Sequence, residues 1–84
     1  LWSEQANPPR LIRSYDFPNF LLALDFVMQV GEIAEEMQHH PSLYLSWGNV
    51  RFELWTHTQG GITEKDHELG EKIETLYRQI YPGK

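Results

Sequence analysis

The spacing of apolar residues along the chain changes between two repeats, and this change limits the possible folds. Residues 50–57 (V-R-F-E-L-W-T-H) alternate cleanly, so every second side chain from Val50 onward lies on one face of a strand. Residues 19–38 instead carry apolar side chains three or four positions apart, which is typical of an amphipathic helix. The chain must therefore combine strands and helices that each bury one side.

Extended along the whole chain, this pattern predicts the order strand, strand, helix, strand, strand, helix. Two prolines make residues 6–9 (A-N-P-P) a turn, and Gly48-Asn49 is a hairpin-type pair between the last two strands. The strands are expected at residues 1–5, 10–17, 42–47 and 50–57. Two hairpins and two helices predict an α+β fold, a four-stranded antiparallel sheet with the helices packed on one face. We expect residues 1–84 to form a single domain.

The helix boundaries are predicted from prolines and capping residues. Pro18 is placed in the first turn of the first helix, and Pro41 ends that helix, with His39 at or near the last turn and His40 in an extended or turn conformation. Thr63 and Asp66 have the spacing of a capping box at the start of the second helix, and Pro82-Gly83 ends it. The predicted buried stripe of the first helix is Phe20, Leu24, Val27, Val30, Ala34 and Met37. That of the second helix is Leu69, Ile73, Leu76, Tyr77 and Ile80.

Composition excludes several classes of function. The 84 residues include no cysteine, so disulfide frameworks and thiolate chemistry are excluded, and the formal net charge of -5 argues against direct nucleic-acid binding. The apolar run of residues 20–30 is interrupted and too short to span a bilayer, so no membrane contact is expected and the cytoplasm is the expected location. Because the first residue is Leu1, we expect further sequence before it. Partial burial of Trp55 on the other face of the sheet would favour an oligomer.

Three histidines from two neighbouring segments suggest either a metal site or a proton-transfer site. His39 and His40 precede Pro41, and His57 ends the alternating segment. Taken singly, a histidine near a helix end is most often only a favourable charge there. A zinc site usually takes four ligands at recognisable spacings, whereas this chain has no cysteine and no H-E-x-x-H motif. Neighbouring extended side chains also diverge, so metal is the weaker alternative.

Acid–base catalysis is the stronger alternative, because imidazole titrates near neutral pH. Elimination of water needs an acid for the departing hydroxyl and a base for the neighbouring proton. Asp66 and Glu35 are the carboxylates available to orient an imidazole, although Asp66 also reads as a capping residue and Glu35 as solvated helix surface. His67 follows Asp66 and reads as exposed helix.

Several motifs occur at specific spacings along the chain, namely Glu35-x-x-x-His39-His40-Pro41, Trp47-Gly48-Asn49-Val50, Leu54-x-Thr56-His57 and Gly60-Gly61-Ile62-Thr63-x-x-Asp66. A tryptophan (Trp2) precedes the first strand, and residues 13–17 form an R-x-[FY]-x-F strand. In these features the sequence resembles the pterin-4a-carbinolamine dehydratase family, also known as dimerisation cofactor of hepatocyte nuclear factor. Family members usually have a helix ahead of the tryptophan, which would belong to the missing N-terminal sequence.

The resemblance implies dehydration of 4a-hydroxytetrahydrobiopterin to quinonoid dihydropterin and water, without a metal or organic cofactor, in tetrahydrobiopterin recycling. It implies dimers that pair into tetramers. The implied catalytic residues are His39, His40, His57 and Asp66. The implied substrate-binding residues are His39, His40, Pro41, Thr56, His57, Thr58, Gln59 and, more weakly, Glu35.

Two departures from the family pattern leave every proton-transfer group in place. Trp47-Gly48 stands where many members have Tyr-Asn, and Trp55 stands where a small residue is common. Both bear on substrate fit and subunit contacts. The alternative is a non-enzymatic binding module on the same fold, because some members act as transcriptional coactivators and degenerate relatives act as assembly factors.

Overall fold

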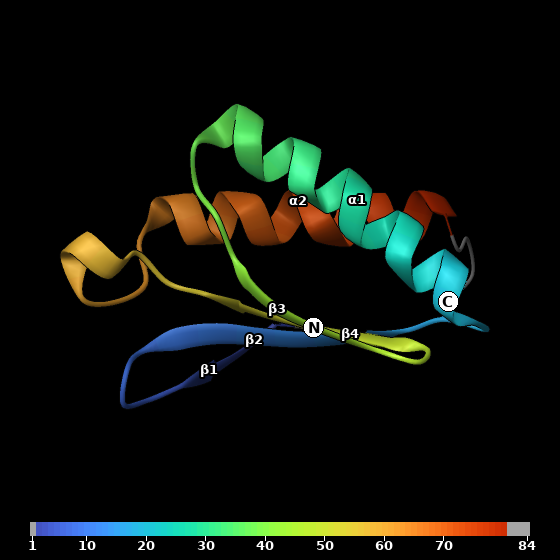
Figure 1. The fold of residues 1–84 in the computed structure, drawn as a ribbon. Helices are drawn as coiled ribbons and strands as arrows, with labels where there is room; N and C mark the ends of the chain where they lie inside the picture. Colours follow the sequence, from blue (N-terminus) through green and yellow to red (C-terminus); the bar gives the residue numbers. More distant parts are fainter. Residues whose placement is uncertain (1, 81–84) are drawn as a thin grey trace.

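The computed structural model describes residues 2–80. Its elements are β1 (Ser3–Gln5), β2 (Arg10–Asp16), α1 (Phe20–Met37), β3 (Ser42–Ser46), β4 (Asn49–Leu54), a short 3₁₀ helix η1 (His57–Gln59) and α2 (Glu64–Ile80). Figure 1 shows both helices on one face of the sheet. The predicted α+β fold and its element order are confirmed. Predictions for Leu1 and Pro82-Gly83 lie outside the described residues.

The four strands form one antiparallel sheet in the order β1-β2-β4-β3. In the central pair, Leu11 lies opposite Leu54 and Tyr15 opposite Val50. These four side chains are buried beneath the helices, as the alternating pattern predicts. β1 and β3 form the two edges, and the strands with buried residues, β2 and β4, lie in the middle.

An aromatic cluster fills the space between the sheet and the helices. The ring of Tyr15 lies 4.6 Å from that of Tyr77 and 5.3 Å from that of Phe26, between centroids. The buried cluster as a whole is Leu11, Tyr15, Phe17, Ala23, Phe26, Val30, Val50, Phe52, Leu54, Leu69, Ile73 and Tyr77. Because these residues come from β2, β4 and both helices, burial of one cluster holds the layers together.

α1 begins and faces the core differently from the prediction. Asn19 is the N-cap, and its Oδ1 accepts a hydrogen bond of 2.9 Å from the Leu22 N–H, so Pro18 lies outside the helix. The predicted stripe was wrong at Phe20 and Leu24, which are 44% and 37% exposed. The fully buried positions are Ala23, Phe26, Val30 and Ala34. A helix with apolar residues nearly all round its first half does not reveal its buried face from sequence.

The β3–β4 hairpin turns one residue earlier than predicted. Ser46 pairs with Asn49, so the two turn residues are Trp47 and Gly48. The Phe17 N–H donates to the Gly48 carbonyl oxygen at 2.8 Å, and a Cβ at Gly48 would lie only 2.7 Å from the Phe17 carbonyl oxygen. The turn is therefore placed by its contact with the end of β2.

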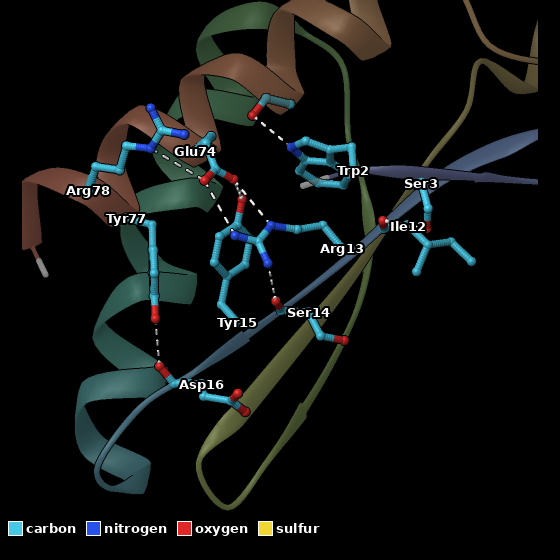
Figure 2. A network of polar contacts seen from close by, with 11 residues as sticks. Trp2, Ser3, Ile12, Arg13, Ser14, Tyr15, Asp16, Glu74, Tyr77 and Arg78 are labelled. Atoms are coloured by element: carbon cyan, nitrogen blue, oxygen red, sulfur yellow. Dashed lines mark hydrogen bonds and ion pairs between the residues drawn. The ribbon is translucent and has the colours of Figure 1, made fainter. Parts of the chain in front are cut away.

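A polar network joins β2 to α2 (Figure 2). Glu74 Oε1 accepts from the Tyr15 hydroxyl at 2.6 Å and from Arg13 Nε at 3.2 Å, and Arg78 Nε lies 3.5 Å from Oε2. Burial alone would raise the pKa of the Glu74 carboxyl, but the hydrogen bonds and charges of its partners outweigh it, so that pKa is lowered. Burial and the Glu74 carboxylate raise the pKa of the Tyr15 hydroxyl.

No helix within residues 2–80 is both long enough and apolar enough to cross a membrane.

Candidate active site

Two connections meet at one end of the molecule (Figure 1). One is the link from α1 to β3, which carries His39-His40-Pro41, and the other runs from β4 through η1 to α2. Two hollows of about 500 Å³ and about 320 Å³ lie here, within the range of roughly 300–1,000 Å³ that is common for small-molecule sites. Both are lined by Gln38, His39, Thr56 and Thr58.

The end of α1 places His39 in this site. Gln38 adopts a left-handed conformation (φ 53°, ψ 41°), and its side-chain amide donates to the Glu35 carbonyl oxygen at 2.7 Å. The His39 N–H then donates back to the Ala34 carbonyl oxygen at 3.1 Å, which satisfies the last turn. The helix thus ends at Met37 with Gln38 as its cap, so the prediction that Pro41 ends it was wrong, whereas His39 lies near the last helical turn as predicted.

His39 forms a short contact with Asp66, a residue in the first turn of α2. The Nε2 of His39 lies 2.6 Å from Oδ1 of Asp66, and the two side chains are 11% and 0% exposed. Asp66 also accepts from the Thr63 N–H at 2.8 Å through Oδ2, which is the carboxylate half of the predicted capping box. One carboxylate therefore caps a helix and holds an imidazole.

This pairing distinguishes the two ring nitrogens of His39, because Nε2 contacts Asp66. When the Asp66 carboxylate is ionised it only accepts hydrogen bonds, and the proton between the two groups then lies on Nε2. Nδ1 of a neutral His39 then carries the free lone pair. A buried carboxylate behind the ring would stabilise the imidazolium that forms when Nδ1 takes a proton.

The other two predicted histidines lie at the rim of the smaller hollow. His40 is exposed and pairs with the exposed Glu35 carboxylate. His57 opens η1 rather than ending a strand, because β4 stops at Leu54, and its ring lies 4.5 Å from the Trp55 ring. The structure thus brings His39, His40 and His57 to one place, with only His39 close to Asp66.

The remaining predicted site residues divide into two groups. Thr56 and Thr58 line both hollows, and Gln59 lines the larger one. Pro41 and Glu35 line neither, and Glu35 instead borders a different hollow between α1 and Leu43.

Sequence reasoning missed several lining residues, namely Gln38, Thr63, Glu64 and Lys65. Thr63 carried a signal as a helix cap and as part of the Gly60–Asp66 motif, but not as a lining residue. Gln38 carried no signal in the sequence. It reaches the site because it adopts a left-handed conformation at the end of α1. Within residues 2–80, no three His, Cys, Asp or Glu side chains gather as a metal site would require.

A sheet covered on one face by two helices, with a His–Asp pair beside hollows at one end, defines an α+β protein equipped for proton transfer. Residues 1–76 match the family model described as pterin 4 alpha carbinolamine dehydratase. The chain belongs to that family.

Individual relatives agree with this assignment. A Rickettsia canadensis protein, provisionally named a pterin-4-alpha-carbinolamine dehydratase, is 49% identical over 65 residues, which are 77% of this chain and 60% of that protein. The crystal structure of a Brucella melitensis protein described as a transcriptional coactivator/pterin dehydratase matches with a TM-score of 0.85 at 29% identity, covering 89% of this chain and 80% of that one.

A third match shows the fold alone. A pterin dehydratase-like protein identified as a RuBisCO assembly factor in the alpha-carboxysome aligns with a TM-score of 0.77 at 22% identity, covering 89% of this chain and 87% of that one.

Proposed function

We propose that this chain dehydrates 4a-hydroxytetrahydrobiopterin to quinonoid dihydropterin and water, in the cytoplasm, as a step of tetrahydrobiopterin recycling. In this reaction the C4a–O bond breaks, the hydroxyl leaves as water after it is protonated, and N5 loses its proton as the C4a=N5 double bond forms. The chain must therefore supply one proton and accept one, and no metal or organic cofactor takes part.

The observation that carries the proposal is the His39–Asp66 pair at the edge of the two hollows. An imidazole with a buried carboxylate 2.6 Å behind it is equipped to take a proton and hold the resulting charge. Membership of the dehydratase family supplies the class of substrate. The side chains of Gln59 and Thr58 on the lining offer hydrogen-bond partners for a polar heterocycle.

We assign the base to His39 and the acid to His57. His39 accepts the N5 proton on Nδ1, because Asp66 occupies its other nitrogen. His57 protonates the 4a-hydroxyl from the rim of the smaller hollow, with His40 beside it as a contact for the pterin. Asp66 orients His39 and does not touch the substrate.

A spectroscopic dehydratase assay on freshly generated carbinolamine tests the proposal. The double variant His39→Ala/His57→Ala should remain folded and lose dehydration by orders of magnitude, since each general acid or base contributes roughly 10²–10⁴-fold. His67→Ala is the matched control, because His67 is an exposed residue of α2 that lines neither hollow. Near-normal turnover in the double variant would contradict the proposal.

A second candidate, a binding module without catalysis, has one observation in its favour. The first half of α1 exposes several apolar side chains, among them Leu21 and Met28, that a protein partner would cover. This candidate predicts that wild-type protein leaves the carbinolamine at its uncatalysed rate while forming a stable complex with that partner. Catalysis that depends on His39 would rule it out as the sole function.

A further inference from the structure

The two oxygens of the Asp66 carboxylate have different partners. Oδ1 contacts His39 Nε2, whereas Oδ2 accepts from the Thr63 N–H at 2.8 Å and from the Thr56 hydroxyl at 2.9 Å. The carboxylate is fully buried, so these contacts replace the water that a carboxylate would otherwise bind. Oδ2 is thereby held on its threonine partners, and Oδ1 is left for the imidazole.

The two threonine hydroxyls are coupled to each other. Thr56 Oγ1 lies 2.7 Å from Thr63 Oγ1. Because the Thr56 hydroxyl gives its only proton to Asp66, it accepts from Thr63, and the donors form one directed chain from Thr63 through Thr56 to Oδ2. The Thr63 hydroxyl is itself 3.4 Å from Oδ2, so it is the weaker direct partner.

Thr56 also has a fixed backbone. Its N–H donates to the Gly61 carbonyl oxygen at 2.8 Å, which closes the loop of residues 56–61 that carries η1 and His57. The Thr56 hydroxyl therefore ties the segment that carries His57 to the carboxylate that holds His39. The hydroxyl points at Asp66, so its role differs from the substrate contact that the family resemblance implies.

We propose that Thr56, supported by Thr63, is a positioning residue that sets the rotamer of Asp66 and, through it, the orientation and protonated nitrogen of His39. The proposal rests on the proposed function only for its effect on catalysis. Its structural part concerns a single proton, the one on His39 Nε2, which can be observed without substrate.

The first experiment detects that proton by NMR in the substrate-free protein. In wild type, the short contact with a buried carboxylate should protect the His39 Nε2–H and give a resolved downfield signal that disappears in His39→Ala. Thr56→Val keeps the branched shape and removes the hydroxyl, so the signal should broaden or vanish. Thr56→Ser should restore it, and Thr75→Val, an exposed change on α2, should leave it unaltered.

The second experiment measures dehydration by the same variants. Thr56→Val should lower kcat by about tenfold to a hundredfold, the range that corresponds to a lost hydrogen bond to a charged group, with little change in KM. Thr56→Ser should recover most of the loss. Thr63→Ala, which removes the supporting hydroxyl, should act in the same direction but less strongly, and it serves as the test if Thr56→Val does not fold.

The outcomes separate the two proposals. A wild-type signal and wild-type kcat in a folded Thr56→Val would overturn the positioning role, as would equal losses in Thr56→Val and Thr56→Ser, which would indicate packing. The two proposals can also fail separately. Suppose that wild type shows the protected proton, that Thr56→Val loses it and that Thr56→Ser restores it, while wild type has no dehydratase activity. The positioning role then stands and the proposed function fails.

Discussion

At the scale of single residues, Asp66 is a buried carboxylate that makes two different kinds of contact. It caps α2 through the Thr63 N–H and contacts His39 on its other oxygen, at zero exposure. Capping α2 and orienting His39 both require a hydrogen-bond acceptor, and each of the two carboxylate oxygens supplies one. The interpretations of Asp66 as a capping residue and as an orienting carboxylate are therefore compatible.

Asp66→Asn should separate these two uses. The amide oxygen must face the Thr63 and Thr56 donors, so the amide NH₂ faces His39 and makes Nε2 an acceptor. The ring proton then moves to Nδ1, the nitrogen that our proposal uses as base. We expect a folded protein whose dehydration is lower by roughly 10²–10⁴-fold, measured by the carbinolamine assay alongside thermal unfolding. Unchanged activity would remove Asp66 from the mechanism.

Gly48 provides a second prediction at this scale. A Cβ there would lie 2.7 Å from the Phe17 carbonyl oxygen, a backbone atom that cannot move aside cheaply. Gly48→Ala should therefore lower the free energy of unfolding by about 1–3 kcal/mol in urea titrations. Gly31→Ala is the control, because nothing lies within 4 Å of its added Cβ, and it should stabilise α1 by roughly 0.5–1 kcal/mol. Equal effects at both glycines would contradict this account.

At the scale of elements, the Glu74 network holds α2 onto β2. The lowered pKa of Glu74 means that its charged form favours the folded state. Its stabilisation is therefore complete above the ordinary pKa of 4.5 and is lost as the pH falls through the lower pKa of the folded protein.

Glu74→Gln should accordingly destabilise the protein in a pH-dependent way. At pH 7 the variant loses hydrogen bonds to a charged group, and we expect a free energy of unfolding lower by about 1–3 kcal/mol. Below the folded pKa of Glu74 the wild-type side chain is itself neutral, so the difference between the two proteins should shrink. Urea unfolding at neutral and acid pH measures this, with the exposed Glu71→Gln as control. A difference that persists in acid would point to packing instead of charge.

At the scale of the whole molecule, the unusual feature is apolar surface on α1. Leu21 is 74% exposed and Met28 64% exposed. A short chain buries a modest share of its surface, so further burial between copies would support it. The dimers or tetramers that the family resemblance implies are expected to use this helix face.

Leu21→Glu/Met28→Glu tests that expectation. Light scattering should show wild type as a dimer or tetramer and the double variant with a lower mass, because charges replace the apolar contact. Gln79→Glu, an exposed change on α2, is the control. If the double variant keeps the wild-type mass, subunit contacts lie elsewhere.

The sequence alone determined the element order and the sheet, since residues such as Val50, Phe52 and Leu54 have a period that only a half-buried strand satisfies. It also singled out Asp66 and the three histidines. Their shared neighbourhood follows from topology, because both connections that carry them end at the same side of the sheet.

Only the tertiary structure decided which groups touch. The short contact of His39 with Asp66 joins residues 27 positions apart, and the Thr56 hydroxyl faces Asp66 because the loop closes on Gly61. The true buried face of α1 was equally hidden, because Leu24 and Ala23 are both compatible with a helix and the packed core selects between them. Local spacing fixes which residues share a face, whereas contacts between distant segments depend on how the faces pack.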